Sequence, residues 1–145
     1  MKSNPYLCSF DGRCEEAFQF YKQALGGEIV ALIRYGDTPM AADMPAVNKN
    51  HVCHARLVYG DNVLMGGDCP PDCYQAPQGF SINLAVETEA EAERLFAVLA
   101  EKGTIRCPMA ETFWAKRFGM CTDQFGIPWM VNCEKVCGEG DTCAG

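Results

Sequence analysis

Of the two histidines in the chain, His54 is followed two residues later by an arginine, Arg56. Residues 51–59 are rich in strand-forming side chains, and successive side chains of a strand point to opposite faces. Simple alternation places Val52, His54 and Arg56 on one face and Cys53 on the more apolar opposite face. An imidazole exchanges protons near neutral pH, and a guanidinium can hold a carboxylate or phosphonate through two parallel hydrogen bonds. The pattern predicts His54 as an acid–base group and Arg56 as a substrate-binding residue; the alternatives are a hydrogen-bonded strand histidine and an edge salt bridge.

Two carboxylates stand beside groups that suit a binding site. Asp68 follows the Gly66-Gly67 pair at the end of an expected strand, where it could orient His54, bind a cation or cap the Pro-rich turn that follows. Glu111 begins a segment, ending at Trp114, that holds a carboxylate, a hydroxyl and two aromatic rings. Such a segment is typical of the rim of an apolar pocket, and equally of aromatic packing. The sequence predicts Glu111 as a second catalytic residue and Asp68 and Trp114 as substrate-binding residues.

Ten cysteines are distributed along the 145 residues. Three residues separate Cys69 from Cys73, and five residues separate Cys137 from Cys143 near the end of the chain. Neither pair has the two-residue gap that marks a zinc ribbon. Three interpretations stay open: free thiols, a redox disulfide, and a metal site made from these four thiolates. We expect residues 135–145 to form a flexible Cys-rich tail.

The charge balance argues against several classes of partner. The chain has 19 acidic and 12 basic residues, a net charge of −7, and no basic cluster longer than Lys116-Arg117. A nucleic-acid backbone or an anionic membrane surface would repel such a protein. No apolar run reaches the length of a signal peptide or a membrane helix. We therefore expect a cytoplasmic globular protein with mostly reduced thiols and with neither nucleic acid nor membrane as a partner.

The candidate residues lie on two stretches with the same predicted order of strand, helix and three strands. The first stretch predicts strands over 5–10, 28–34, 51–59 and 62–67 and a helix that starts near Asp11–Cys14 and stops at Gly26-Gly27. The second predicts strands over 80–86, 104–109, 115–122 and 127–133 and a helix from a capping box at Thr88 to a left-handed Gly103. Residues 35–50 show no period and predict a long loop. We expect one domain over 1–134, with module one at 4–68 and module two at 79–134.

Short motifs of glycine, aromatic and acidic residues occur between residues 4 and 134. They include Pro5-Tyr6-Leu7, Phe10-Asp11-Gly12, Leu25-Gly26-Gly27, His54-Ala55-Arg56-Leu57, Glu111-Thr112-Phe113-Trp114, Phe118-Gly119, Asp123-Gln124-Phe125-Gly126 and Trp129-Met130-Val131-Asn132. Taken together in this order they resemble the PhnB-like branch of the vicinal-oxygen-chelate superfamily, which includes glyoxalase I, extradiol dioxygenases and fosfomycin- and bleomycin-resistance proteins. The resemblance implies an α+β fold in which two β-α-β-β-β modules form an open, cupped mixed-sheet cleft with the helices outside.

The same resemblance bears on metal binding. Metal-using members carry His, Gln or Glu at four inward positions, and here the resemblance puts Pro5, Met65, Ser81 and Met130 at those positions, within about one residue. None is a good ligand for a hard or borderline divalent ion. We therefore expect no metal and no cofactor, and we assign Ser81 and Met130 to the substrate-binding surface.

Three functions follow as hypotheses. The first is a PhnB-like small-molecule enzyme whose reaction the residues do not specify, and the second is a non-catalytic protein that binds an antibiotic-type small molecule. A thiol or metal sensor that uses the Cys-rich tail is the third. The resemblance also implies a homodimer, because superfamily members commonly build their cleft from two subunits and an open sheet edge invites pairing.

Overall fold

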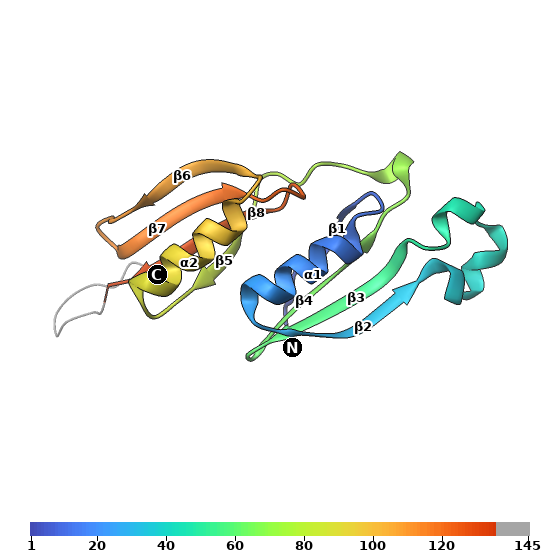
Figure 1. The fold of residues 1–145 in the computed structure, drawn as a ribbon, viewed down its shortest axis with the longest axis horizontal. Coiled ribbons are helices and arrows are strands. Elements are labelled where there is room, and N and C mark those ends of the chain that lie inside the picture. Colours follow the sequence, from blue (N-terminus) through green and yellow to red (C-terminus); the bar gives the residue numbers. More distant parts are fainter. Residues whose placement is uncertain (136–145) are drawn as a thin grey trace. The chain divides into compact units, whose positions relative to one another are not determined.

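The computed structural model describes residues 1–135 and divides the chain into two units after Ala76 (Figure 1). The first unit contains β1 (Tyr6–Phe10), α1 (Cys14–Leu25), β2 (Glu28–Arg34), β3 (Val52–Tyr59) and β4 (Asn62–Asp68). The second contains β5 (Ile82–Ala85), α2 (Glu89–Ala100), β6 (Thr104–Ala110), β7 (Ala115–Thr122) and β8 (Pro128–Glu134). The two predicted β-α-β-β-β modules are confirmed, and the predicted ends of the strands differ from these by at most two residues.

Each unit builds one four-stranded mixed sheet in the same way. The strand order is β1-β4-β3-β2 in the first and β5-β8-β7-β6 in the second. In both sheets the first strand of the unit pairs in parallel with the last, and the other pairings are antiparallel. The mixed α+β fold class expected from the sequence is therefore confirmed.

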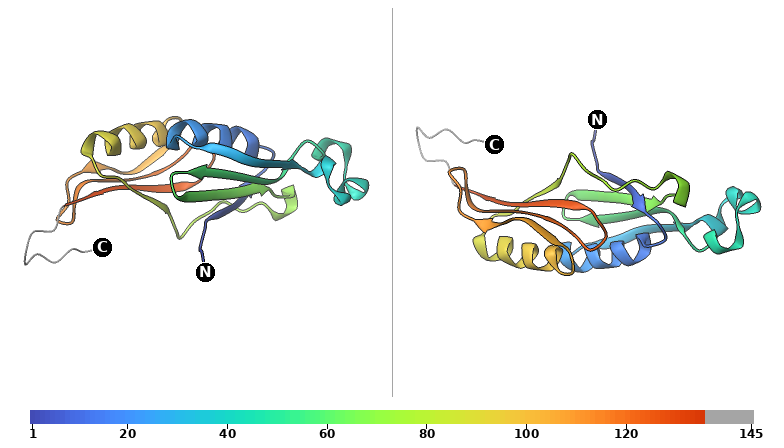
Figure 2. Two further views of the ribbon diagram at one scale, coloured as in Figure 1. Left: turned by 90° about the horizontal axis from the view of Figure 1, so that it is seen from below. Right: turned by 90° about the horizontal axis from the view of Figure 1, so that it is seen from above.

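Helix α1 packs on one face of the first sheet (Figure 2). Its buried side chains recur at helical spacing, which gives the helix a single apolar stripe. They are Cys14, Ala17, Phe18, Tyr21 and Ala24. The helix ends at Gly26, whose φ of 72° is the left-handed conformation and whose N–H donates to the Lys22 carbonyl at 3.0 Å.

Helix α2 packs on one face of the second sheet in the same manner, through Ala92, Leu95, Phe96 and Leu99. It starts as predicted at Thr88, whose Oγ1 accepts a hydrogen bond from the Glu91 N–H at 3.2 Å. The prediction for its other end was wrong. Lys102, with φ 57°, is the left-handed residue, and Gly103 has an ordinary φ. Gly103 is needed for a different reason, because a Cβ there would overlap the Thr122 carbonyl oxygen.

Strand β3 departs from the simple alternation expected at its start. Ile33 pairs with His54 and Arg34 pairs with Val52, so Cys53 is an extra residue in the ladder. Val52 is buried on the helix side, whereas Cys53 is partly exposed. The bulge reverses the predicted faces of Val52 and Cys53 and leaves those of His54 and Arg56 unchanged.

Residues 35–50 link β2 to β3. The predicted long loop contains three short 3-10 helices, η1 (Tyr35–Asp37), η2 (Pro39–Asp43) and η3 (Ala46–Asn48). Its two ends are tied together, because the Gly36 N–H donates to the Lys49 carbonyl at 2.8 Å and the Tyr35 N–H donates to the His51 carbonyl at 2.9 Å. The loop is therefore an ordered projection from the end of the sheet.

Candidate functional site

The face of the first sheet that α1 leaves uncovered carries several polar side chains. Strand register aligns Tyr6 of β1 with Met65 of β4, and Met65 with Arg56 of β3. Residues paired in this way point to the same side of a sheet. His54 precedes Arg56 by two residues and shares that side. We call these four residues, Tyr6, His54, Arg56 and Met65, the first open face.

Tyr6 and His54 form a close pair on this face. The Tyr6 hydroxyl oxygen lies 3.1 Å from His54 Nδ1, and the two rings stack with centroids 5.7 Å apart and planes inclined by 23°. Burial raises the pKa of the Tyr6 phenol, and the nearby thiols of Cys8 and Cys53 raise it further, so the phenol stays protonated at neutral pH. It can therefore donate to Nδ1, which leaves the proton of the neutral imidazole on Nε2.

Arg56 supplies a cation on the same face. Its side chain is exposed and forms no ion pair with any residue of the part described, 1–135. Met65, partly exposed, lies between Arg56 and Tyr6 in the register. The first open face thus places a proton-exchanging imidazole and an unpaired guanidinium around one thioether.

Asp68 lies on the other side of β4 and is only 4% exposed. Its Oδ1 accepts a hydrogen bond from the Cys14 N–H at 3.0 Å, and its Oδ2 accepts one from the Val52 N–H at 2.8 Å. The N-cap residue of α1, Arg13, makes no side-chain cap, so Asp68 supplies that acceptor. Both carboxylate oxygens therefore accept from the backbone amides that start α1 and β3, a role different from the three considered from the sequence.

The second unit holds the other sequence candidates. Glu111 is exposed, and its Oε1 lies 2.9 Å from Lys135 Nζ. The hydrogen bond and the charge of Lys135 lower the pKa of Glu111, which keeps it a carboxylate at neutral pH. Trp114 is partly buried between two rings, with its centroid 4.7 Å from Phe113 and 5.2 Å from Phe118. Glu111 is thus held as an anion, and the aromatic segment packs on itself.

Ser81 and Met130 occupy different parts of the second sheet. Ser81 comes just before β5 and is partly exposed, whereas Met130 of β8 pairs with Asn83 of β5 and with Met120 of β7. Two residues further along β8, Asn132 is 7% exposed and donates from Nδ2 to Glu134 Oε1 at 3.3 Å. Its Oδ1 is buried and accepts no hydrogen bond from the residues that the structure describes.

Tyr6 of the first open face and Asn132 of β8 were not among the site residues predicted from the sequence. The signal for Tyr6 was present in the motif Pro5-Tyr6-Leu7, but the register of β1 on β4 was needed to turn its side chain toward His54. For Asn132 no pattern in the sequence shows that the amide oxygen is left without a donor.

The cysteines within residues 1–135 form no disulfide. Cys137 and Cys143 lie outside the described residues, and so does most of the expected tail at 135–145. Within the described part, no group of three or more His, Cys, Asp or Glu side chains could hold a metal ion. In the same part, no helix combines the length and apolar character that crossing a membrane requires.

The fold described above is that of a known protein superfamily. The family model of the Glyoxalase/Bleomycin resistance protein/Dioxygenase superfamily matches residues 5–131, and the chain therefore belongs to that superfamily. Within it, the chain is a PhnB-like member of the vicinal-oxygen-chelate group. The solved structure of the PhnB protein from Bacillus cereus is 26% identical, with a TM-score of 0.74, over 92% of this chain and 99% of that one.

Two further relatives are more similar in sequence. Protein YjdN of Escherichia coli (strain K12) is 35% identical over 143 residues, which are 93% of this chain and 97% of that protein. The crystal structure of protein PA1353 from Pseudomonas aeruginosa is 48% identical, with a TM-score of 0.85, over 94% of this chain and 99% of that one. The fosfomycin resistance protein FosX from Mesorhizobium loti, with 10% identity and a TM-score of 0.61, shares the fold.

Proposed function

We propose that this protein is a small-molecule enzyme that transfers a proton through His54 and holds an anionic group of its substrate with Arg56. The observation that carries the proposal is the 3.1 Å contact between the Tyr6 hydroxyl and His54 Nδ1, on a sheet face that also presents an unpaired guanidinium. Acid–base histidines are usually held by a hydrogen bond at one ring nitrogen, while the other ring nitrogen is left for the substrate.

Each residue of the first open face has a separate part in this chemistry. Tyr6 stacks on the imidazole and bonds to Nδ1, which fixes the position of the ring. Nε2 forms no hydrogen bond with residues 1–135. When the Tyr6 hydroxyl accepts from Nδ1–H, the lone pair of Nε2 can take a proton from the substrate, and the imidazolium so formed can return that proton from Nε2. Arg56 can bind a carboxylate or phosphonate through two parallel N–H···O bonds.

Proton transfer by His54 does not require the metal ion that the family implies. The register aligns Met65 with Tyr6 and Met130 with Asn83, so the donors beside the two methionines are a phenol and an amide, in place of the expected Pro5 and Ser81. Thioethers are soft, and a protonated phenol and an amide are weak donors, so this set suits none of the divalent ions that oxygen chemistry requires. We infer that the proton chemistry of His54 runs without a metal at these positions.

A ligand screen followed by one substitution tests the proposal. Thermal shifts are measured with divalent metals, α-keto acids, thioether conjugates and glycopeptide antibiotics, since a ligand at 100 times its Kd adds about 2.7 kcal/mol to stability. We expect anionic compounds to raise the midpoint, and His54→Gln to lower turnover of the best compound by roughly 10²–10⁴-fold with an unchanged unfolding midpoint. His51→Gln is the matched control, because His51 lies outside the first open face, and it should leave turnover unchanged.

Two results would remove this assignment. If His54→Gln lowers stability by about 1–3 kcal/mol and leaves ligand affinity unchanged, His54 is a hydrogen-bonded strand residue. If compounds bind, none is converted and His54→Gln weakens binding alone, the protein is a non-catalytic binder, which is the class to which an antibiotic-binding function belongs. Stabilisation by metals only would instead contradict the proposed metal independence.

We also propose that the chain forms a homodimer. Strand β2 is an edge of the first sheet, and its Val30 and Ile33 side chains are 57% and 43% exposed. An unpaired strand edge with apolar side chains favours pairing with a second copy. Light scattering should give about twice the chain mass of 15.9 kDa. A mass equal to that of one chain at micromolar concentration would contradict the dimer.

A further inference from the structure

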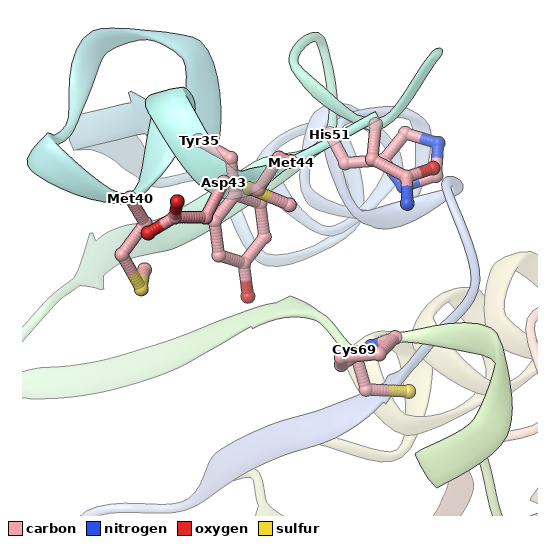
Figure 3. Close-up of a pocket in the computed structure, with 8 residues that line it drawn as sticks. Tyr35, Met40, Asp43, Met44, His51 and Cys69 are labelled. Carbon is pink, nitrogen blue, oxygen red and sulfur yellow. The ribbon is translucent and has the colours of Figure 1, made fainter. Parts of the chain in front are cut away.

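A cavity of about 420 Å³ lies in the first unit, between the 35–50 loop and the end of β4 (Figure 3). The loop contributes Tyr35, Met40, Asp43 and Met44, His51 lies where the loop joins β3, and Cys69 follows β4. A volume of this size is within the range of pockets that hold small molecules. None of these six residues belongs to the first open face, so the cavity is a second feature of the same unit.

The walls of the cavity are held in place by hydrogen bonds. The Tyr35 hydroxyl donates to the Asp68 main-chain carbonyl at 3.0 Å and so joins the loop to the end of β4. Thr38 Oγ1 donates to the Tyr35 carbonyl at 2.7 Å and accepts from the Met40 N–H at 3.3 Å. Next to Tyr35, His51 packs on Gly12, where an added Cβ would lie only 3.0 Å from its Nε2. A pocket with ordered walls loses little entropy on binding.

The side chains that line the cavity favour one sign of charge on a ligand. Tyr35, Met40, Met44 and Pro70 present apolar or polarisable surface, and the lining contains no Lys or Arg. Burial raises the pKa of the Tyr35 phenol, so Tyr35 is neutral and presents an uncharged ring. Asp43 is the acidic side chain of the lining. It is exposed and pairs with no cation of the described residues, 1–135.

A neutral aromatic ring, two thioethers and one carboxylate together select a particular kind of ligand. The faces of aromatic rings attract cations, and thioether sulfur makes favourable contacts with aromatic rings. A carboxylate in such surroundings favours a positive charge on the ligand and opposes a negative one. The net charge of −7 adds a general attraction for cations.

We propose that this cavity binds an organic cation, with a substituted ammonium group beside Asp43 and an apolar, ring-sized body against Tyr35, Met40 and Met44. This binding goes beyond the proposed function, because it uses neither His54 nor Arg56. The protein therefore has two ligand sites of opposite preference in one unit, an anion-binding one at Arg56 and a cation-binding one at Asp43.

Benzyltrimethylammonium is a suitable probe, and benzenesulfonate is its anionic counterpart. The protein is labelled with ¹³C at the methionine methyl groups and titrated at pH 8, where an ordinary imidazole is neutral. We expect a saturable shift of the Met40 and Met44 methyl signals with the cation, no such shift with the anion, and an undisturbed Met65 signal. Saturation at millimolar concentrations is expected, because the probe is small.

Asp43→Asn and Asp37→Asn form a matched pair of variants. Both aspartates are exposed residues of the same loop, and Asp37 does not line the cavity, so both variants should fold normally. Asp43→Asn should raise the Kd of the cation roughly three- to tenfold, as expected for a partly solvated charge pair, and Asp37→Asn should leave it within about twofold.

Several results would overturn the inference. These are an unchanged Kd in Asp43→Asn, an equal effect in Asp37→Asn, the same saturable shift with benzenesulfonate, a response at Met65 in place of Met40 and Met44, or no saturable shift below about 20 mM. His54→Gln separates this inference from the proposed function, because that variant should bind the cation as the parent does. Cation binding that persists when the first open face proves inactive leaves the cavity assignment intact.

Discussion

The two units have the same topology, but within residues 1–135 the one buried aspartate of each unit is used differently. Asp68 joins segments that are far apart in sequence, since its carboxylate accepts from Cys14 at the start of α1 and from Val52 at the start of β3. Asp123 acts within one turn and accepts from the Phe125 and Ile127 N–H groups and from Trp129 Nε1–H at 2.8–3.0 Å. In the first unit the carboxylate therefore substitutes for local capping, whereas in the second it builds a local turn.

The connection between the second and third strands differs just as much. In the second unit Thr112 closes a short turn, with hydrogen bonds in both directions to Ala115 at 3.0 Å. In the first unit the same connection is the 35–50 loop with its three 3-10 helices and the cavity beneath it. A repeated scaffold thus keeps its sheets and varies its connections, which is where binding surfaces usually arise.

The largest effect is expected in thiol reactivity, between exposed cysteines of the first unit and a buried cysteine of the second. Cys8 and Cys73 of the first unit are exposed, whereas Cys121 of the second is buried, and burial raises its pKa to about 11. At pH 8 iodoacetamide should modify Cys8 and Cys73 about a thousandfold faster than Cys121, because both the thiolate fraction and access are lower there. Peptide mapping by mass spectrometry measures each rate.

Denaturant supplies the control for this comparison. In urea-unfolded protein the three thiols should react at similar rates, because the fold that protects Cys121 is gone. Rapid modification of Cys121 in the native protein would show that β7 opens much more readily than its burial indicates.

Asp68→Asn should lower the free energy of unfolding by about 2–4 kcal/mol. The amide oxygen keeps one of the two backbone bonds, the NH₂ group faces the other donor, and the negative charge at the N-terminus of α1 is lost. Urea unfolding followed by far-UV circular dichroism measures the change. Asp72→Asn, at an exposed position, is the control and should stay within about 0.5 kcal/mol of the parent protein.

The same variant also tests how independent the units are. Both tryptophans, Trp114 and Trp129, lie in the second unit, so their fluorescence reports that unit alone. If the unfolding transitions of Asp68→Asn followed by fluorescence and by circular dichroism coincide, the units unfold together. A fluorescence transition that stays at the parent midpoint while circular dichroism shifts would show that they unfold separately.

Asp123→Asn should cost less, about 1–3 kcal/mol. Its amide oxygen can keep both backbone bonds of the turn, and the bond to Trp129 Nε1–H is the one that is lost. The near-ultraviolet signal of Trp129 should change together with the unfolding midpoint. Asp61→Asn, in the exposed β3–β4 hairpin, is the control. A cost larger than that of Asp68→Asn would reverse the conclusion that the long-range carboxylate matters more.

The smallest effect is expected for the exposed pair of Glu111 and Lys135. Lys135→Met should raise the pKa of Glu111 toward its ordinary value, because the hydrogen bond and charge of Lys135 are what lower it. A carboxyl whose pKa is lowered by folding stabilises the protein above its ordinary titration range and loses that contribution as the pH falls. Because both side chains are exposed to solvent, the unfolding midpoint should not move. NMR titration of the Glu111 carboxyl carbon measures the pKa, and an unchanged pKa would contradict the assignment.

The alternation and turn signals were enough to predict both modules, because both helices and most strands carry their own period of more and less exposed residues. The start of α2 followed from Thr88 in the same local way. The faces of Val52 and Cys53 did not follow, because a bulge of one residue depends on how β2 aligns with β3. Lys102 takes the left-handed position expected of Gly103, and Gly103 is required instead where the chain passes the Thr122 carbonyl.

The candidate site was less predictable than the fold. His54 and Arg56 share a face because they are two residues apart on one strand, which the sequence shows directly. The partnership of His54 with Tyr6 depends on a parallel pairing between β1 and β4, whose register no local pattern encodes. The role of Asp68 was equally hidden, because its partners lie 54 and 16 residues away in the chain.

The parallel pairing of first and last strands has a consequence for how the chain folds as it is synthesised. In each unit the opening strand, β1 or β5, has as its sheet neighbour the strand made last, β4 or β8. Until β4 has emerged from the ribosome, β1 lacks its partner and the carboxylate of Asp68 cannot reach the start of α1. The nascent chain therefore passes through a stage, up to about residue 68, in which a strand edge and an apolar helix stripe are exposed together. Completion of β4 ends this stage for the first unit before the second has begun to form.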